Sequence, residues 1–505
     1  MTARLAYIAV LFAATLVAAE HRIVGMTASG KPIEALVVTG APPTSPTVML
    51  IGGLNDSSNA GSESAKMVSA AVQDFESDRP DRRRFRLLAV PLANPDKSQL
   101  AFPPAGVAYR ENVESHVLWR WIALQAPDLV LIVGPGDSGL AQALSTNAVA
   151  GVGRIPARVI ITARPTTLLS LPREIPSSEA HVEINRRRAR SPRELAEELG
   201  QYFGHDFNQL TYIPGMALIA QMRLGHVTDV EQLAAPYLDP SRNILSRANS
   251  LTLAGHLVFA ELAERAGDKR YAGLVQKAAD LGFAETGEIR ESMPFHDEMS
   301  DSVFMATPLV VKAGKLTGER KYFDLAARHV AFMQKLVLRE DGLYRHSPLT
   351  EAAWGRGNAF PALGLALALS DFPKDHPAYA NMMAEFQQHM FVLARFQDQD
   401  GMWREVIDEP GSYAETSATA MIGFAIERGI RRGWLDPAAY QPRVNRAWSA
   451  VQARVGTDGQ LVDVCESTNK QNTLQDYLHR AAILGPDPRG GAMAMLFATE
   501  MVGLP

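Results

Sequence analysis

Helical periodicity over the last three hundred residues is the feature that most limits the fold. From about residue 210 to the end, apolar and charged residues recur at the i, i+3, i+4, i+7 spacing of amphipathic helices. This spacing predicts helices at 251–265, 271–281, 303–315, 322–336, 358–369, 378–397, 415–432, 440–455 and 490–501. With two more between 214 and 237 and one near 474, about a dozen helices joined by short turns are expected.

Weak self-similarity groups these helices into hairpins. The segments 260–271 and 311–322 both end one helix on a glycine turn and begin the next with a basic residue and a tyrosine. Repeated helical hairpins build either an open solenoid or a closed ring. A solenoid has near-identical repeats, whereas the loops here differ and several carry Trp, His, Asp and Arg. The pattern therefore favours a closed double ring, an (α/α)6 toroid, with a funnel at one end.

Residues from about 20 to 200 have a different sequence pattern, in which short β-branched runs alternate with segments of helical spacing. Strands are predicted at 33–39, 47–51, 85–90, 129–133 and 157–162, and helices at 64–75 and 113–126. This alternation predicts an α/β domain with a largely parallel sheet. Polar stretches follow three of the strands, two of them rich in glycine, and ligands of open α/β sheets usually bind at such strand ends. Two domains are therefore expected, 20–200 and 205–505.

The order of motifs in this first domain resembles the zinc carboxypeptidase fold. A Gly-Gly strand end is followed by Asn-Pro-Asp at 94–96, a helix, and the strand 129–133. In that family the zinc ligands are two His and a Glu, and the corresponding positions here hold Asn55, Ser58 and, approximately, Gly134. Zinc prefers His, Cys and carboxylate ligands. The resemblance therefore implies a metal-free relative, which is either purely structural or retains a cleft for a sugar or peptide.

The first nineteen residues predict a secretory signal. Arg4 precedes an apolar run, 5–17, and small residues lead to an expected cleavage after Ala19. An uncleaved anchor is the alternative. No other apolar run reaches the roughly 18 residues of a membrane span, so none is expected after signal removal. The protein is therefore expected to be periplasmic or secreted.

Charge and cysteine content exclude other classes. The formal net charge is −5, with Lys and Arg scattered, so no nucleic-acid partner is expected. The one dense basic run, 186–190, is interpreted as a solvated linker between domains. The single cysteine, Cys465, excludes an intramolecular disulfide, and we interpret it as a small buried hydrophobe.

Acids, imidazoles, aromatics and glycines concentrate in three clusters, 296–305, 342–346 and 354–360. They converge only if the helices between them are antiparallel and their same-side ends share one mouth. Asp301 stands at the entry of an apolar helix, where a carboxylate is either an N-cap or a functional group. Asp297 lies four residues earlier, and the two would share a face if that segment were helical.

The loops supply groups suited to an anionic sugar. Such a site needs aromatic faces, a carboxyl group to move protons and cationic donors for a uronate. His346, Trp354, Arg356 and Trp403 provide candidates, although Trp403 is equally suited to closing the core of the ring and His346 to a structural role. The run 296–298 lacks the spacing of metal ligands on one helix face, so neither a metal nor a cofactor is expected.

Several motifs in order resemble the unsaturated glucuronyl and rhamnogalacturonyl hydrolases, glycoside hydrolase families 88 and 105. The similarity runs from about residue 210 to the end, and its motifs are 301–308, 342–346, 354–358, 401–403, 415–421, 429–435, 477–478 and 487–492. The Trp-Gly-Arg-Gly-Asn run at 354–358 is the most specific. The resemblance implies an (α/α)6 barrel that removes 4,5-unsaturated uronic acid from the non-reducing end of lyase-generated oligosaccharides.

The chemistry implied by this resemblance is hydration of an enol ether. A carboxylic acid protonates C4, water adds at C5, and the resulting hemiketal opens so that the glycosidic bond breaks. Asp301 aligns with the catalytic aspartate of the family, and the substrate-binding set is expected to comprise His346, Trp354, Arg356, Asp297, Trp403 and Glu415. Arg356 suits a uronate carboxylate. The sequence departs from the family at Ser300 and Phe360, where Trp is usual, and 247–250 offers no second aspartate.

Three alternatives remain open on sequence grounds. An inverting glycosidase would need two carboxylates about 6.5–9.5 Å apart, and Asp301 with Glu415 or Asp487 is the candidate pair. A non-catalytic sugar-binding protein would keep Trp354 and Trp403 but tolerate loss of the aspartate. Metallopeptidase activity in the first domain is disfavoured by the residues at the zinc positions.

Overall fold

The chain folds into two compact units. The computed structural model describes residues 19–38, 41, 44–55, 58–78, 83–161, 171 and 174–504, so the predicted signal at 1–19 lies outside the described residues except for Ala19. The sheet unit comprises residues up to Ala105 and 114–182, and the helical unit comprises 106–113 and the chain from Glu183 onward. This division falls before the predicted boundary at 200–205.

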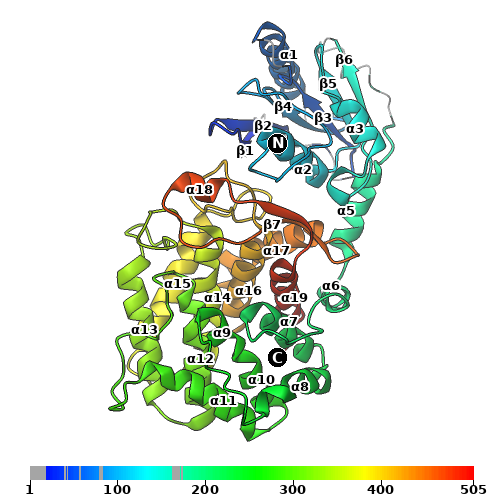
Figure 1. Ribbon diagram of the computed structural model, residues 1–505. Helices are drawn as coiled ribbons and strands as arrows, with labels where there is room; N and C mark the ends of the chain where they lie inside the picture. Colours follow the sequence, from blue (N-terminus) through cyan, green and yellow to red (C-terminus); the bar gives the residue numbers. More distant parts are fainter. Residues whose placement is uncertain are drawn as a thin grey trace, which may run out of the picture. The chain divides into compact units, whose positions relative to one another are not determined.

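The sheet unit contains a mixed sheet in the order β1-β2-β4-β3-β5-β6 (Figure 1). The strands are β1 Glu20–Met26, β2 Pro32–Val38, β3 Thr47–Ile51, β4 Arg86–Val90, β5 Leu129–Val133 and β6 Ala157–Ile160. The last four pair in parallel, whereas β1 and β2 are antiparallel additions at one edge. Its helices include α1 Ser58–Ser77, α2 Val113–Gln125 and α3 Leu140–Thr146. The predicted sheet is therefore present, and β1, whose register shifts between Ile23 and Gly25, was not predicted.

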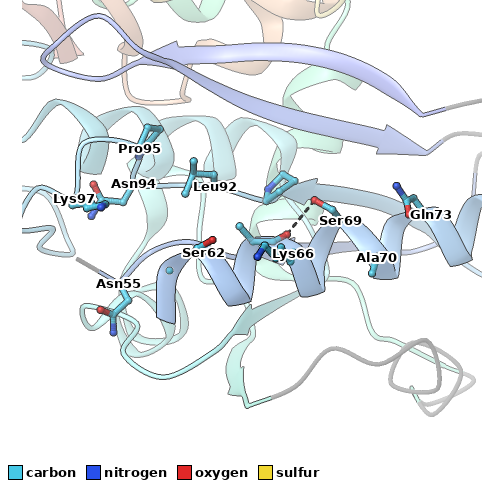
Figure 2. A pocket seen from close by; sticks show the side chains of 13 residues that line it. Asn55, Ser62, Lys66, Ser69, Ala70, Gln73, Leu92, Asn94, Pro95 and Lys97 are labelled. Carbon is cyan, nitrogen blue, oxygen red and sulfur yellow. Dashed lines mark hydrogen bonds between the residues drawn. The ribbon is translucent and has the colours of Figure 1, made fainter. Parts of the chain in front are cut away.

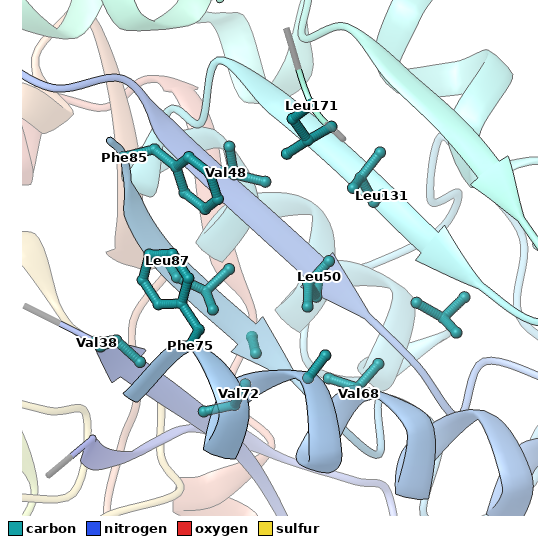
Figure 3. Close-up of a cluster of buried hydrophobic side chains, with 13 residues drawn as sticks. Val38, Val48, Leu50, Val68, Val72, Phe75, Phe85, Leu87, Leu131 and Leu171 are labelled. Carbon is teal, nitrogen blue, oxygen red and sulfur yellow. The ribbon is translucent and has the colours of Figure 1, made fainter. Parts of the chain in front are cut away.

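The core of this unit lies between the parallel strands and α1 (Figure 3). Val48 and Leu50 from β3 pack in one buried cluster with Val68 and Val72 from α1. All five residues of β3 are buried. A strand buried on both faces has an uninterrupted apolar sequence, and for that reason periodicity alone locates it well.

The helical unit is a closed ring of inner helices surrounded by outer ones. The inner helices are α7 Tyr212–Arg223, α9 Ser250–Gly255, α12 Ser302–Thr317, α14 Gly355–Asp371, α16 Thr416–Arg431 and α19 Pro488–Val502. Each packs against the next, and α19 also packs against α7, which closes the ring. The outer helices include α6 Pro192–Gly200, α8 Val227–Ala234, α11 Lys269–Ala279, α13 Lys321–Val337, α15 Tyr379–Arg395 and α17 Pro437–Arg454. This closure is what a toroid requires and an open solenoid lacks. A break at His256 separates α9 from α10 (Leu257–Arg265), which were predicted as one helix.

The contacts show that the inner helices run in the same direction. At one end of the ring, the Tyr212 ring at the start of α7 contacts Phe304 and Phe360 near the starts of α12 and α14. At the other end, Arg223 and Arg428 both bind Glu500 near the ends of their helices. The N-termini of the inner helices therefore meet at one mouth. Among the described residues, none of the helices is both long and apolar enough to span a bilayer.

One expectation about the basic run is wrong. Arg187 and Arg190 are buried rather than solvated. Arg187 Nη1 donates to the Ala453 carbonyl at 3.2 Å, and Arg190 Nη2 donates to the Gln452 and Val455 carbonyls at 2.9 and 2.6 Å. The carbonyls at a helix C-terminus lack intrahelical partners and carry partial negative charge. Part of the run therefore caps the end of α17, which a count of charges does not reveal.

Gly364 is where α14 comes into backbone contact with α12. A Cβ at this position would lie 2.7 Å from both the Phe304 Cα and the Val303 carbonyl oxygen. We therefore expect Gly364→Ala to destabilise the protein by about 1–3 kcal/mol, since backbone atoms cannot move aside cheaply. The control is Gly273→Ala in α11, where a Cβ meets nothing within 4 Å and about 0.5–1 kcal/mol of stabilisation is expected. Thermal unfolding measures both, and equal midpoints for the two variants would contradict the close helix packing.

Candidate active site

Asp301 lies at the mouth and does not cap its helix. It occupies the N-cap position of α12, but its side chain accepts no hydrogen bond from the helix N–H groups. Instead its Oδ1 lies 3.4 Å from Nε2 of the buried His346, and among the described residues neither atom has a hydrogen-bond partner. The purely capping interpretation of Asp301 is therefore wrong, and the carboxyl group remains available for another role.

Tyr477 orients His346. The backbone N–H of Gln471 donates to the Tyr477 hydroxyl oxygen at 3.2 Å, and this hydroxyl lies 2.7 Å from His346 Nδ1. Because the oxygen already accepts one bond, its own proton is available to Nδ1. A neutral imidazole that accepts at Nδ1 carries its proton at Nε2. In the tautomer with the proton on Nε2, an N–H of His346 points toward Asp301, whose Oδ1 lies 3.4 Å away. Tyr477 was noted in the sequence only as part of a family motif.

Behind the imidazole lies a buried acid that sequence reasoning missed. The His346 and Trp354 rings are 4.5 Å apart, and the Trp354 indole donates to Glu405 Oε1 at 2.8 Å. The Cys465 thiol donates to the same oxygen at 3.1 Å. Burial, and secondarily the charge of Glu415, raises the pKa of Glu405 to about 8. The sequence signal that could have identified Glu405 is its place between Trp403 and the apolar pair at 406–407, where a carboxyl group is expected to be buried.

Arg356 is a buried cation fixed from several sides. Its guanidinium carbon lies 4.9 Å from the centre of the Trp354 ring. Nη1 donates to the Cys465 carbonyl at 2.8 Å and to the Ser417 hydroxyl at 3.3 Å, and it lies 3.9 Å from Glu415 Oε1. Among the described residues its Nε has no partner. The cation is therefore held through Nη1, while its Nε–H has no partner among the described residues.

Glu415 supports the site from behind. It is fully buried, caps α16 and accepts hydrogen bonds from the Ser417 hydroxyl and from the Ala418 and Cys465 N–H groups. The structure therefore places it beside Arg356 rather than in the mouth. Cys465 is buried, as predicted.

Asp297 and Trp403 are not brought together with Asp301. The backbone at Phe295, Asp297 and Glu298 is left-handed, with φ of 64°, 50° and 56°, so this segment is not helical. The condition under which Asp297 and Asp301 would share a helix face is therefore not met, and Asp297 is exposed. Trp403 is fully buried and its indole donates to the Leu393 carbonyl at 2.7 Å. It occupies the core position that the sequence left open as its alternative.

The mouth is electrostatically suited to an anion. The partial positive charges of the inner-helix N-termini converge there. Arg489, which follows the α19 cap Asp487 and pairs with it at 2.6 Å, adds a cation. Burial raises the pKa of Tyr212 to about 12, and the charges of Arg356 and Asp301 also act on its hydroxyl, so this group stays a neutral donor. Tyr212 and Arg489 had no individual role in the sequence analysis.

Four buried polar atoms without a protein partner mark this site within the described residues. They are Ser300 Oγ, Asp301 Oδ1, His346 Nε2 and Arg356 Nε. Space between them is preserved by Gly357, where a Cβ would lie 3.0 Å from Ser300 Oγ and 3.5 Å from His346 Cδ2. Buried polar groups are almost always paired in folded proteins. Such a group of unpaired donors and acceptors therefore points to a polar ligand.

Glu405 gives the helical unit a testable pH dependence. Its pKa of about 8 exceeds the ordinary carboxyl value, so between those pH values the folded state retains a proton that the unfolded state has lost. Stability should then fall as pH rises through this window, with a slope of up to about 1.4 kcal/mol per pH unit. Glu405→Gln mimics the protonated form and should remove the slope. Unfolding midpoints of both proteins from pH 5 to 9 test this, and parallel curves would contradict it.

The sheet unit has a separate cavity of about 680 Å³ (Figure 2). One side is formed by Ser62, Lys66 and Gln73 of α1, and the other by the chain after β4, including Asn94 and Lys97. It lies at the carboxyl ends of β3 and β4, where ligands were expected.

The carboxypeptidase zinc positions have other uses here. The Asn55 amide donates to the Pro135 carbonyl at 2.9 Å. A Cβ at Gly134 would lie 2.9 Å from Ser64 Cβ, so a histidine does not fit there. The side chain of Ser58 lies outside the described residues. The metal-free character of this unit stays a prediction.

Comparison with known proteins identifies the family. The profile described as Glycosyl Hydrolase Family 88 matches residues 204–504, and the chain belongs to this family. The predicted family is thereby confirmed for the helical unit. The resemblance of residues 20–200 to carboxypeptidases stays a prediction.

Curated relatives match over part of their length. The chain is 30% identical over 184 residues to the unsaturated 3S-rhamnoglycuronyl hydrolase of Formosa agariphila, covering 32% of this chain and 48% of the relative. It is 28% identical over 189 residues to the unsaturated rhamnogalacturonyl hydrolase YesR of Bacillus subtilis, covering 35% and 52%. The chain thus spans about half the length of these two relatives.

Solved structures share the fold of the helical unit. A possible member of the GH105 family from Salmonella enterica superposes with a TM-score of 0.53 at 19% identity, covering 68% of this chain and 98% of that one. A glycosyl hydrolase family 88 protein from Bacteroides vulgatus gives 0.52 at 17% identity, covering 63% and 100%. At these identities the likeness concerns the fold alone.

Proposed function

We propose that the helical unit is a glycosidase that removes 4,5-unsaturated uronic acid from the non-reducing end of oligosaccharides left by polysaccharide lyases. The observation that carries this proposal is the group of unpaired polar atoms on Asp301, His346 and Arg356 at the mouth. These three residues supply a carboxyl group, an imidazole and a cation at one place. The names of the two curated relatives, both unsaturated uronyl-type hydrolases, support the same substrate class.

The proposed reaction begins with protonation of C4 of the unsaturated sugar by the Asp301 carboxyl group. The positive charge that develops at C5 and the ring oxygen is then captured by water, whose oxygen bonds to C5. The water returns a proton to the Asp301 carboxylate, which restores the acid. The hemiketal at C5 then opens to a ketone, and its hydroxyl proton passes to the ring oxygen, which leaves a hemiacetal at C1. This hemiacetal collapses to an aldehyde as the bond from C1 to the glycosidic oxygen breaks, and that oxygen takes the hemiacetal proton and leaves as the alcohol of the shortened oligosaccharide.

Neighbouring groups have distinct parts in this scheme. The His346 N–H stabilises the Asp301 carboxylate after it has given up its proton. The free Nε–H of Arg356 binds the uronate carboxylate, which is conjugated to the reacting double bond. Trp354 supports both groups through its ring contacts.

Ultraviolet absorbance tests the proposal directly. The conjugated enol-ether acid absorbs and its hydrated product does not. We expect purified protein to abolish the absorbance of disaccharides made by lyases from at least one of pectin-, heparin- and ulvan-type polysaccharides. No loss of absorbance with any of the three, from protein shown to be folded, would refute the proposal.

An ordinary inverting glycosidase fits the geometry less well. It requires a second carboxylate with a free oxygen to activate water. Glu415 uses its oxygens for Ser417 and two backbone N–H groups. Asp487 is occupied by Arg489 and by capping α19. A non-catalytic sugar-binding protein is distinguished by the absorbance assay itself.

We further infer that the sheet unit is a metal-free, carboxypeptidase-like domain that binds a ligand rather than hydrolysing one. The cavity beside Lys66 and Lys97 supports a binding role. Stoichiometric zinc in the purified protein would contradict the metal-free assignment. We also propose that the protein is exported with its first nineteen residues removed, and a mature N-terminus other than Glu20 would contradict that cleavage site.

A further inference from the structure

A short segment from the N-terminal half of the chain belongs to the helical unit. This segment, the 106–113 loop, is preceded and followed in sequence by residues of the sheet unit. Its ends are held together there, because His116 Nε2 and the Ala105 carbonyl are hydrogen-bonded at 3.3 Å. The sequence motifs discussed above do not include this loop, and the matched family region begins only at residue 204.

Tyr109 makes the central contacts of the loop. Its ring stacks on Tyr413, with centroids 4.4 Å apart and planes at 16°. Its hydroxyl donates to Asp463 Oδ1 at 3.2 Å, and its carbonyl accepts from His479 Nδ1 at 3.2 Å. Tyr109 is buried and has a left-handed φ of 63°, which is costly for a non-glycine residue. The contacts must therefore outweigh this local strain.

Arg110 adds contacts at the edge of the same surface. Its Nη2 donates to Glu466 Oε1 at 2.7 Å, and its Nε donates to the His479 carbonyl at 3.3 Å. The side chains of Arg110 and Glu466 are 42% and 36% exposed, so this ion pair contributes little energy by itself. Its effect is to fix the orientation of the loop beside Tyr109.

Tyr413 and Asp463, which Tyr109 contacts, lie in segments whose backbone positions residues of the candidate active site. The Tyr413 carbonyl accepts from the Glu405 N–H at 2.8 Å, and Glu405 in turn holds the Trp354 indole. Asp463 stands at the bulge of β7 (Gln460–Cys465), which pairs with β8 (Ala482–Pro486), and has a left-handed φ of 59°.

The contact between Tyr109 and Asp463 is connected through strand β7 to Arg356. Cys465 follows Asp463 by two residues, and its carbonyl accepts from Arg356 while its N–H donates to Glu415. A shift of the β7 bulge would therefore move the carbonyl that holds the cation. Tyr109 thus adjoins the supports of both Trp354 and Arg356.

We propose that Tyr109 and Arg110 are positioning residues for the sugar site, which act by fixing Tyr413 and the β7 bulge. The inference rests on the proposed function for its effect on catalysis. Neither residue touches the reacting atoms in this scheme. Removing the Tyr109 side chain takes away the stacking partner of the Tyr413 ring and the hydrogen bond from the Tyr109 hydroxyl to Asp463. The geometry of Arg356 and Trp354 then relaxes, and the uronate is bound more weakly.

The first readout is the Michaelis constant. We expect Tyr109→Ala to raise KM about tenfold, because a stacked aromatic pair and a hydrogen bond are both lost. Tyr109→Phe retains the ring and should raise KM less. The matched control is Tyr202→Ala, which removes a half-exposed tyrosine of the same unit that donates to the Thr457 carbonyl. KM does not depend on the fraction of folded enzyme, so general destabilisation would not reproduce the effect.

The second readout is independent of sugar chemistry. Cys465 is the only cysteine of the chain and is fully buried. If Tyr109 fixes the surrounding backbone, the labelling rate of Cys465 by a thiol reagent should rise about tenfold in Tyr109→Ala and stay unchanged in Tyr202→Ala. This measurement needs no substrate.

The two readouts separate the possible failures. Faster labelling with an inactive wild-type enzyme would refute the proposed function but support the structural role of the loop. Faster labelling with an unchanged KM would overturn the proposal that the loop acts on the sugar site. Unchanged labelling and unchanged KM in Tyr109→Ala would overturn the inference entirely.

Discussion

Asp301→Asn should lower kcat on lyase-generated disaccharides by about 10³-fold, the typical contribution of a general acid. The amide has nearly the shape of the carboxyl group but cannot deliver a proton to C4. Because the Asp301 side chain makes no cap hydrogen bond, its replacement should leave the start of α12 and the stability of the protein unchanged. KM should change little, since the charge of Arg356 and the aromatic contacts remain. Absorbance loss at saturating substrate measures kcat.

The matched control for this prediction is Asp436→Asn. Asp436 caps the outer helix α17 by accepting from the Ala438 N–H. The same chemical change at a cap outside the site should leave kcat as in the wild type. If Asp301→Asn retained wild-type kcat, the catalytic acid would have to be another group, and the proposed mechanism would be refuted even if the enzyme activity were real.

Arg356→Lys should raise KM by about 10- to 100-fold, because charge-assisted hydrogen bonds of roughly 1.5–3 kcal/mol to the uronate are lost. Lysine retains the charge but lacks the planar fork that reaches Cys465 and Ser417 while leaving Nε free. The carbonyl of Cys465 then loses its buried donor, so the unfolding midpoint should fall as well. Steady-state kinetics and thermal unfolding measure the two effects.

Arg428→Lys provides the control for the loss of stability. Arg428 is also buried, and it binds Glu500 at 2.6 Å at the opposite end of the same ring of helices. Its replacement should lower the unfolding midpoint and leave KM unchanged. A KM for Arg356→Lys that equals that of Arg428→Lys would show that Arg356 does not bind the uronate.

Local patterns in the sequence were enough to locate most of the helices and the buried strands. Helix periodicity located the long inner and outer helices, since each presents an apolar face or is apolar all round. The buried strands β3 and β5 were located at their observed bounds, because uninterrupted apolar runs are distinctive. Near residue 207 the sequence pattern changes from β-branched runs to helical spacing, and this change separated a sheet-containing part from a helical part. The ordered motifs from Asp301 to Asp487 predicted the family and the acid at the mouth.

The set of groups that meet at the mouth depends on how distant segments pack together. Glu405 and Tyr477 lie far from Asp301 in sequence, and their roles depend on hydrogen bonds to Trp354 and His346 across the mouth. Trp403 and Asp297 looked suited to the site, but ring closure buried the first and a left-handed turn exposed the second. The 106–113 loop carries no periodic signal at all. The type of each side chain can be read directly from the sequence. The distance between residues of remote segments depends on helix packing and backbone turns, which local patterns do not encode.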